Sequence, residues 1–94
     1  MAAKSILIGY DLNNPRQNND YKDLIEKIKT LSATRWHCLD STWIIKSDAT
    51  CVQVRDALTP FLDSGDELLV VELTGSGAWK GFDDNCSKWL KNNV

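Results

Sequence analysis

Residues that build metal sites and disulfide frameworks are scarce in this chain of 94 residues. It has one histidine, His37, and three cysteines, Cys38, Cys51 and Cys86. An odd number of cysteines without a Cys-x-x-Cys pair is typical of reduced thiols, not of a disulfide framework. The paired spacing of structural zinc ligands is missing too. We therefore expect free thiols in a cytoplasmic protein and no zinc site.

Long apolar runs and an excess of positive charge are also missing. No apolar run approaches the roughly 20 residues that a membrane helix needs, and no charged-then-apolar signal segment is present, so we expect no membrane contact. The 11 basic and 13 acidic residues give a formal net charge of -2. A typical duplex-binding protein is clearly basic, so this balance argues against broad nucleic-acid affinity but leaves room for a local basic patch.

The first half of the chain contains short apolar runs and one amphipathic segment. The run at 6–8, followed by Gly-Tyr-Asp, predicts a buried strand that ends near Asp11. Helical spacing of apolar residues predicts a helix over about 20–32, capped by Asn19 or Asp20. Residues 35–46 predict two strands around a tight Asp-Ser turn, or a single strand with a bulge.

The second half predicts a helix, a strand and a short final helix. The second helix is expected to start near residues 47–50 and to bend or end at Pro60, which has no backbone N–H. The apolar run at 67–73 predicts the next strand. The last helix is expected to start near Phe82, with Asp83 as its cap.

This order of elements predicts an α+β fold. Strand, helix, strand, strand, helix, strand is the order of the ferredoxin-like βαββαβ sandwich, a four-stranded antiparallel sheet with two helices on one face. We expect a single domain over residues 1–94, with its core at about 4–73 and a short helical appendage in the extension 74–94.

Asp11 is the first candidate functional residue, because it is expected where the first strand ends. Carboxylate oxygens are ligands of hard cations such as Mg²⁺ or Mn²⁺, and two copies at a two-fold axis would supply two of them. Alternatively, Asp11 caps the Asn-rich turn that follows it. On the residues alone, turn capping is the favoured interpretation.

Residues 36–43 hold the densest group of unusual side chains. His37, Asp40 and Ser41 are the residue types of a catalytic triad, but neighbours on a hairpin point to opposite faces and the elbow around a nucleophilic serine is missing. We reject a triad and expect Trp36 or Trp43 to pack under a helix.

Two further groups are candidates for binding. Trp79 and Phe82 flank a lysine and could stack on bases or on another protein, or fold back on the sheet edge, which we favour. Arg16 and Arg35 could join one basic patch near the first loop, although most charges of this kind only solvate a surface.

The opening Ile8-Gly9-Tyr10-Asp11-Leu12, in this order of elements, resembles the ferredoxin-like CRISPR-associated adaptation proteins, the second of the two universal adaptation proteins. The closer match is their stand-alone SinR-like offshoot, which shares the Gly-Tyr-Asp-Leu-Asn opening and the Asp-Ser-Thr-Trp segment at 40–43. The strands at 43–45 and 66–71 also match in position. The resemblance covers about residues 4–73.

The resemblance implies a homodimer that associates with nucleic acid. Some members are metal-dependent nucleases in which the Tyr-Asp aspartate of both subunits lies near the metal; here that residue is Asp11, with Tyr10 beside it and Mg²⁺ or Mn²⁺ as the cation. Others bind nucleic acid without chemistry, as a bridge between integrase subunits. This chain is mildly acidic and has a Trp-containing tail, and in both features it differs from the family members that bridge integrase subunits.

A non-catalytic role is the alternative. In that case the chain is a homodimeric interaction module, in which the dimer edge, Trp79 and Phe82 bind a protein or a small ligand. Exposure of these two aromatic side chains would favour the module, whereas two Asp11 carboxylates close together across a dimer axis would favour the metal-dependent reaction.

Overall fold

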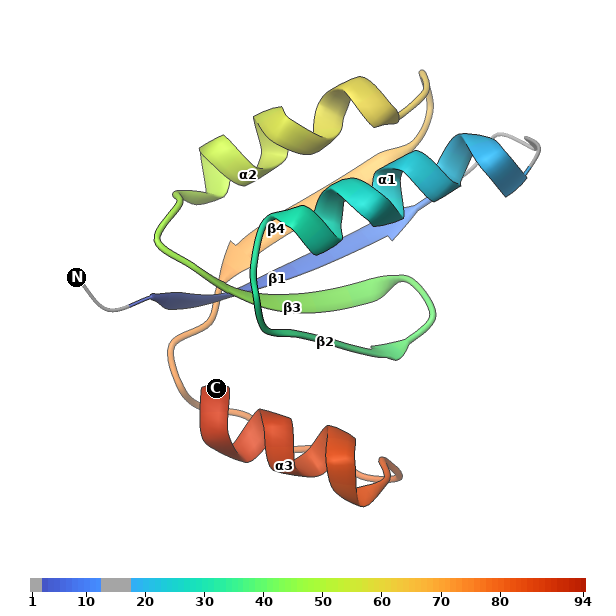
Figure 1. Ribbon diagram of the computed structural model, residues 1–94. Helices are drawn as coiled ribbons and strands as arrows, with labels where there is room; N and C mark the ends of the chain where they lie inside the picture. The colour runs from blue at the N-terminus through green and yellow to red at the C-terminus, as the bar shows by residue number, and fades with distance from the viewer. Residues whose placement is uncertain (1–2, 13–17) are drawn as a thin grey trace.

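The computed structural model of the chain describes residues 3–12 and 18–94, with one four-stranded antiparallel sheet in the order β2-β3-β1-β4. Figure 1 shows α1 and α2 on one side of this sheet and α3 on the other. The elements are β1 Lys4–Asp11, α1 Asn18–Thr30, β2 Arg35–Leu39, β3 Thr42–Ser47, α2 Cys51–Leu58, the 3-10 turn η1 Thr59–Phe61, β4 Glu67–Glu72 and α3 Asp84–Asn93. The predicted ferredoxin-like α+β fold is confirmed.

The predicted boundaries differ from the observed ones by one to three residues. Helix α1 starts at Asn18 and ends at Thr30, two residues earlier at each end than expected. The side chains of the two expected caps, Asn19 and Asp20, lie outside the part of the chain that is described. The segment 35–46 forms two strands, as predicted, and the irregularity in their pairing falls between Trp36 and Leu39.

Strand parity divides the sheet into two faces. Successive side chains of a strand point to opposite faces, and Ile6 and Ile8 of β1 are fully buried beneath the helices. The first core therefore lies between the sheet and α1 and α2. Its buried members are Ile6, Ile8, Trp43 and Ile45 from the sheet, Leu24 and Ile28 from α1, and Val54 and Leu58 from α2.

The opposite face carries a second, smaller core beneath α3. Trp36 of β2, Ile44 of β3 and Leu90 of α3 are buried together there. The indole Nε1 of Trp36 donates a hydrogen bond of 3.2 Å to the carbonyl of Cys86 in the first turn of α3. The appendage at 74–94 is thus a packed cover over part of the sheet.

Local signals place the ends of α2 and the start of α3 close to where the sequence predicts them. Thr50 and Gln53 form a capping box at the start of α2, which satisfies two free backbone donors. Helix α2 ends at Leu58, and the η1 turn that follows contains Pro60, a residue without a backbone N–H. Asp83 caps α3 by accepting a bond of 2.8 Å from the backbone N–H of Cys86.

The cysteines differ from the expectation of three reduced thiols. Cys38 of β2 and Cys86 of α3 form a disulfide, whereas Cys51 is free and half-buried. The two partners are 48 residues apart in sequence, so no short motif signals the pairing. The tertiary packing of α3 on β2 brings them together, and the expectation was wrong for this pair.

Candidate functional site

Asp11 stands directly opposite an acidic residue of the neighbouring strand. In the antiparallel register of β1 and β4, Asp11 pairs with Glu67. Paired residues of an antiparallel ladder point to the same face, with Cβ atoms about 4.5–5.5 Å apart. Both residues are exposed, and both line one open pocket of about 340 Å³. The structure therefore supplies a second carboxylate in the same chain, which the sequence did not reveal.

The end of the sheet around this pair is acidic. Asp66 precedes Glu67, and its carboxylate accepts a hydrogen bond of 2.8 Å from the backbone N–H of Asp63. The hydroxyl of Tyr21 in α1 also lies 3.4 Å from both oxygens of Asp66. These contacts hold the turn before β4 against the start of α1. The described carboxylates at this end of the sheet attract cations and repel phosphate.

Tyr10 does not share a face with Asp11. Its ring packs against the first core, and its hydroxyl accepts a hydrogen bond of 3.1 Å from the indole Nε1 of Trp43. Consecutive residues of a strand point to opposite faces, so Tyr10 lies on the helix side and Asp11 on the other. The structure therefore separates the two halves of the Tyr-Asp pair.

Arg35 lies at the other end of the sheet from Asp11. It pairs with Ile45, which in turn pairs with Ile6 near the start of β1. At about 3.3 Å per residue of β1, the row of paired residues that contains Arg35, Ile45 and Ile6 lies about 16 Å from Asp11 along that strand. Arg16, the other predicted member of the basic patch, lies outside the described residues, as does most of the turn that Asp11 was expected to cap.

The hairpin at 36–43 has a packing role, in agreement with the rejection of a triad. The imidazole of His37 stacks on the indole of Trp43, with ring centroids 3.7 Å apart and planes 7° from parallel. Its Nδ1 lies 3.1 Å from the carbonyl oxygen of Thr42. Within residues 3–12 and 18–94 no group of three or more His, Cys, Asp or Glu side chains is placed to hold a metal ion.

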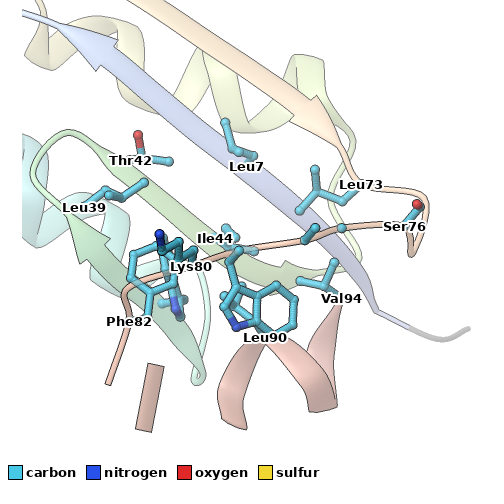
Figure 2. A pocket seen from close by; sticks show the side chains of 14 residues that line it. Leu7, Leu39, Thr42, Ile44, Leu73, Ser76, Lys80, Phe82, Leu90 and Val94 are labelled. Atoms are coloured by element: carbon cyan, nitrogen blue, oxygen red, sulfur yellow. The ribbon is translucent and has the colours of Figure 1, made fainter. Parts of the chain in front are cut away.

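A second pocket lies between the sheet and residues 74–83, which we call the strap. Figure 2 shows Ser76, Lys80 and Phe82 on the strap, Leu7 and Ile44 on the sheet, and Leu90 on α3. The pocket has a volume of about 360 Å³. Gly75 and Gly81 have φ of 95° and 92°, a region that favours glycine, so the strap turns at both ends.

The two predicted aromatic interaction residues of the strap differ in exposure. Trp79 lines the pocket and is 38% exposed. Phe82 is half-buried and packs edge-on against Trp36, with ring centroids 5.1 Å apart. Phe82 thus folds back on the sheet, and Trp79 keeps a free surface.

The sheet face around β4 is the other apolar surface in the described part of the chain. Leu69 and Val71, on the side away from α1 and α2, are 57% and 37% exposed. Strand β4 is an edge of the sheet, and α3 packs on β2 at the opposite edge. An uncovered edge strand with apolar side chains is a surface that natural proteins usually cover.

No helix within the described ranges has the length and apolar character needed to cross a lipid bilayer.

Comparison with known proteins identifies the fold only. No protein-family model matches the chain. Among solved structures, it is similar to a hypothetical protein from Thermus thermophilus, TT1823, with a TM-score of 0.65 and 17% sequence identity. The match covers 85% of this chain and 93% of that one. At this identity the likeness extends to the arrangement of strands and helices.

Proposed function

We propose that this chain is a nucleic-acid-associated protein of the CRISPR-adaptation-like type, and that Asp11 holds a divalent cation for phosphodiester cleavage. The observation that carries the proposal is the pairing of Asp11 with Glu67 over an open pocket at the end of β1. The Gly-Tyr-Asp-Leu-Asn opening supports the assignment of type.

The donor set suits magnesium better than zinc. Mg²⁺ keeps several of its waters and is held by one or two carboxylates together with substrate phosphates. Asp11 and Glu67 supply two carboxylates in one chain. Structural zinc would need four ligands, with Cys or His among them. The pair therefore fits a cation that is completed by water and by the nucleic acid.

Because the pair is negatively charged, nucleic acid would bind at this pocket only together with a divalent cation. The carboxylates of Asp11 and Glu67 line the same pocket, and together they repel a phosphate backbone. A bound Mg²⁺ would offset this charge and polarise a water for attack on phosphorus. In this arrangement the two carboxylates would hold the ion, and the open pocket would admit the phosphate.

The experiment that tests this function is a cleavage assay with matched variants. Labelled short RNA and duplex DNA are incubated with the protein in Mg²⁺, Mn²⁺ or chelator. Asp11→Asn is expected to lower the cleavage rate by at least about 100-fold, as loss of an electrostatic catalytic group does, and Glu67→Gln to lower it less. Asp48→Asn, an exposed carboxylate at the end of β3 away from Asp11, is the control and should leave the rate unchanged.

Cleavage that persists in chelator, or that Asp11→Asn leaves intact, would remove Asp11 from the reaction. Binding is measured in parallel by fluorescence anisotropy of the same labelled strands. Binding without cleavage in every metal would assign the chain a scaffold role on nucleic acid. Absence of both would leave the second candidate function.

That second candidate is a non-catalytic homodimeric module, and the exposed side chains of β4 favour it. A dimer in which a second copy packs against this face of β4 would bury Leu69 and Val71. Leu69→Asp is expected to shift the protein from dimer to monomer in light scattering. Leu39→Asp, on the edge strand β2 and 48% exposed, is the matched control. A monomeric parent protein would refute the dimer.

A further inference from the structure

The pocket beneath the strap has the size of a small-molecule site and is open on one side. Its volume of about 360 Å³ is within the range of ligand pockets. The sheet forms its floor, the strap one wall and the end of α3 another (Figure 2). It is separate from the Asp11 pocket, because no residue lines both.

The lining is apolar with one ionisable group. The only charged side chain among the lining residues is that of Lys80, and the side chains that carry a hydroxyl are those of Thr42 and Ser76. The remaining walls are aliphatic or aromatic. The lining includes Leu7, Leu39, Ile44, Leu73, Trp79 and Phe82.

Lys80 has no ion pair with a carboxylate within the described residues, unlike Lys4, which lies 3.6 Å from Glu72. It shares this with several other lysines of the chain, but Lys80 alone among them lines the apolar pocket. A cation beside an apolar cavity is complemented by an anion on the ligand that fills the cavity.

We propose that this pocket binds a small amphipathic carboxylic acid, with its aliphatic or aromatic body between the strap and the sheet and its carboxylate on Lys80. The body displaces water from the apolar lining, which supplies the affinity. Lys80 supplies the preference for an acid over a neutral molecule of the same shape. The site is independent of cleavage at Asp11, and it gives the interaction-module alternative a ligand class.

The walls are held in place without a ligand. Phe82 packs edge-on against Trp36, and the Trp36 indole donates to the carbonyl of Cys86. Cys86 is in turn linked to Cys38 of β2 by the disulfide. These contacts fix the end of the strap to the sheet. Binding then requires little ordering of the protein, which favours affinity for small ligands.

The test is a titration of the intact protein with octanoate and with octanol, followed by tryptophan fluorescence and by amide shifts of Thr42 and Ser76. Octanoate is expected to bind saturably and at least about fivefold more tightly than octanol, as a charge-assisted hydrogen bond provides. Decanoate should bind about 15-fold more tightly than octanoate, because each of its two additional buried methylenes adds about fourfold.

Two pairs of variants separate the charge effect from a general loss of structure. Lys80→Gln should abolish the preference for octanoate over octanol and leave the affinity for octanol unchanged. Lys88→Gln on α3 is the control and should leave both affinities unchanged. Leu39→Asp should weaken octanoate binding by at least about fivefold compared with Leu39→Asn, because the added charge repels the acid.

Three results would overturn the proposal: no saturable binding, equal affinity for acid and alcohol, or an unchanged preference in Lys80→Gln. The titration measures ligand binding, so its result does not depend on the result of the cleavage assay. A protein that cleaves nucleic acid but binds no amphipathic acid refutes only the pocket. A protein that binds the acid and cleaves nothing refutes only the catalytic proposal.

Discussion

The indole Nε1 of Trp43 donates a hydrogen bond of 3.1 Å to the hydroxyl of Tyr10, on the face of the sheet that α1 and α2 cover. Trp43 is 3% exposed, so water does not replace this acceptor easily. The side chain of Tyr10 therefore contributes to the first core, whereas the carboxylate of Asp11 lies on the opposite, open face of the sheet.

We predict that Tyr10→Phe destabilises the protein without affecting any reaction at Asp11. The variant leaves the buried indole N–H of Trp43 without an acceptor, which costs about 1–3 kcal/mol of unfolding free energy. Urea denaturation measures this loss. In a double-mutant cycle with Trp43→Phe, the two changes should be coupled by about 1 kcal/mol. A loss below about 0.5 kcal/mol would show that the bond is not stabilising.

A second prediction concerns the disulfide between Cys38 and Cys86. Closing a loop across a separation of 48 residues restricts the unfolded chain, so Cys86→Ser should lower the unfolding free energy by about 2–4 kcal/mol. A reductant should have the same effect on the parent protein and almost none on the variant. Thermal denaturation with and without reductant provides the measurement.

The third cysteine offers the matched control for that prediction. Cys51 is free, so Cys51→Ser removes a thiol without opening a loop, and the response to reductant should persist. Titration of thiols under denaturing, non-reducing conditions should find one group in the parent protein. Three reactive thiols would contradict the bond.

The sequence predicted the local elements and the return of Phe82 to the sheet, but it did not predict the disulfide or which helix covers Trp36. The reason is that the sequence signals are local and these contacts are not. Helical spacing and capping residues are local, so α2 and α3 were placed within a few residues. The disulfide and the cover over Trp36 depend on contacts between β2 and a tail about 50 residues away. The sequence did contain one indication that both faces of the sheet are covered. Trp43-Ile44-Ile45 is apolar on both faces of its strand, as in strands that are covered on both sides.

The second carboxylate of the candidate site was missed for a related reason. Asp11 could be placed at a strand end from the sequence, but its partner depends on the register of β1 against β4. A shift of one residue would move Glu67 to the other face, and nothing local in either strand decides the register. Burial of Leu68 and Val70 against the first core selects the observed pairing.

A third prediction tests how firmly α3 is attached. Asp83→Ala removes the acceptor for the backbone N–H of Cys86 and should cost about 1 kcal/mol. Asp83→Ser retains a capping oxygen and should restore most of the stability. Unfolding curves of the three proteins make the comparison. Equal stability of the alanine and serine variants would mean that the cap contributes nothing.

The last prediction concerns Lys46, which joins the sheet to the end of α3. Its Nζ donates bonds of 3.2 Å to Ser5 Oγ and to the carbonyl of Asn93, and Ser5 Oγ donates to the same carbonyl. A cation at a helix C-terminus offsets the partial negative charge of the last carbonyls.

Lys46→Met keeps most of the side-chain length but removes the charge and both donors, and should cost about 1–2 kcal/mol of unfolding free energy. Lys91→Met is the control: Lys91 is exposed in the last turn of α3, and its loss should cost at most about 0.5 kcal/mol. Amide hydrogen exchange should show faster opening of α3 in Lys46→Met alone. The same exchange rates in both variants would mean that the carbonyl of Asn93 is satisfied equally well by water, and that α3 is held by Leu90 and the disulfide.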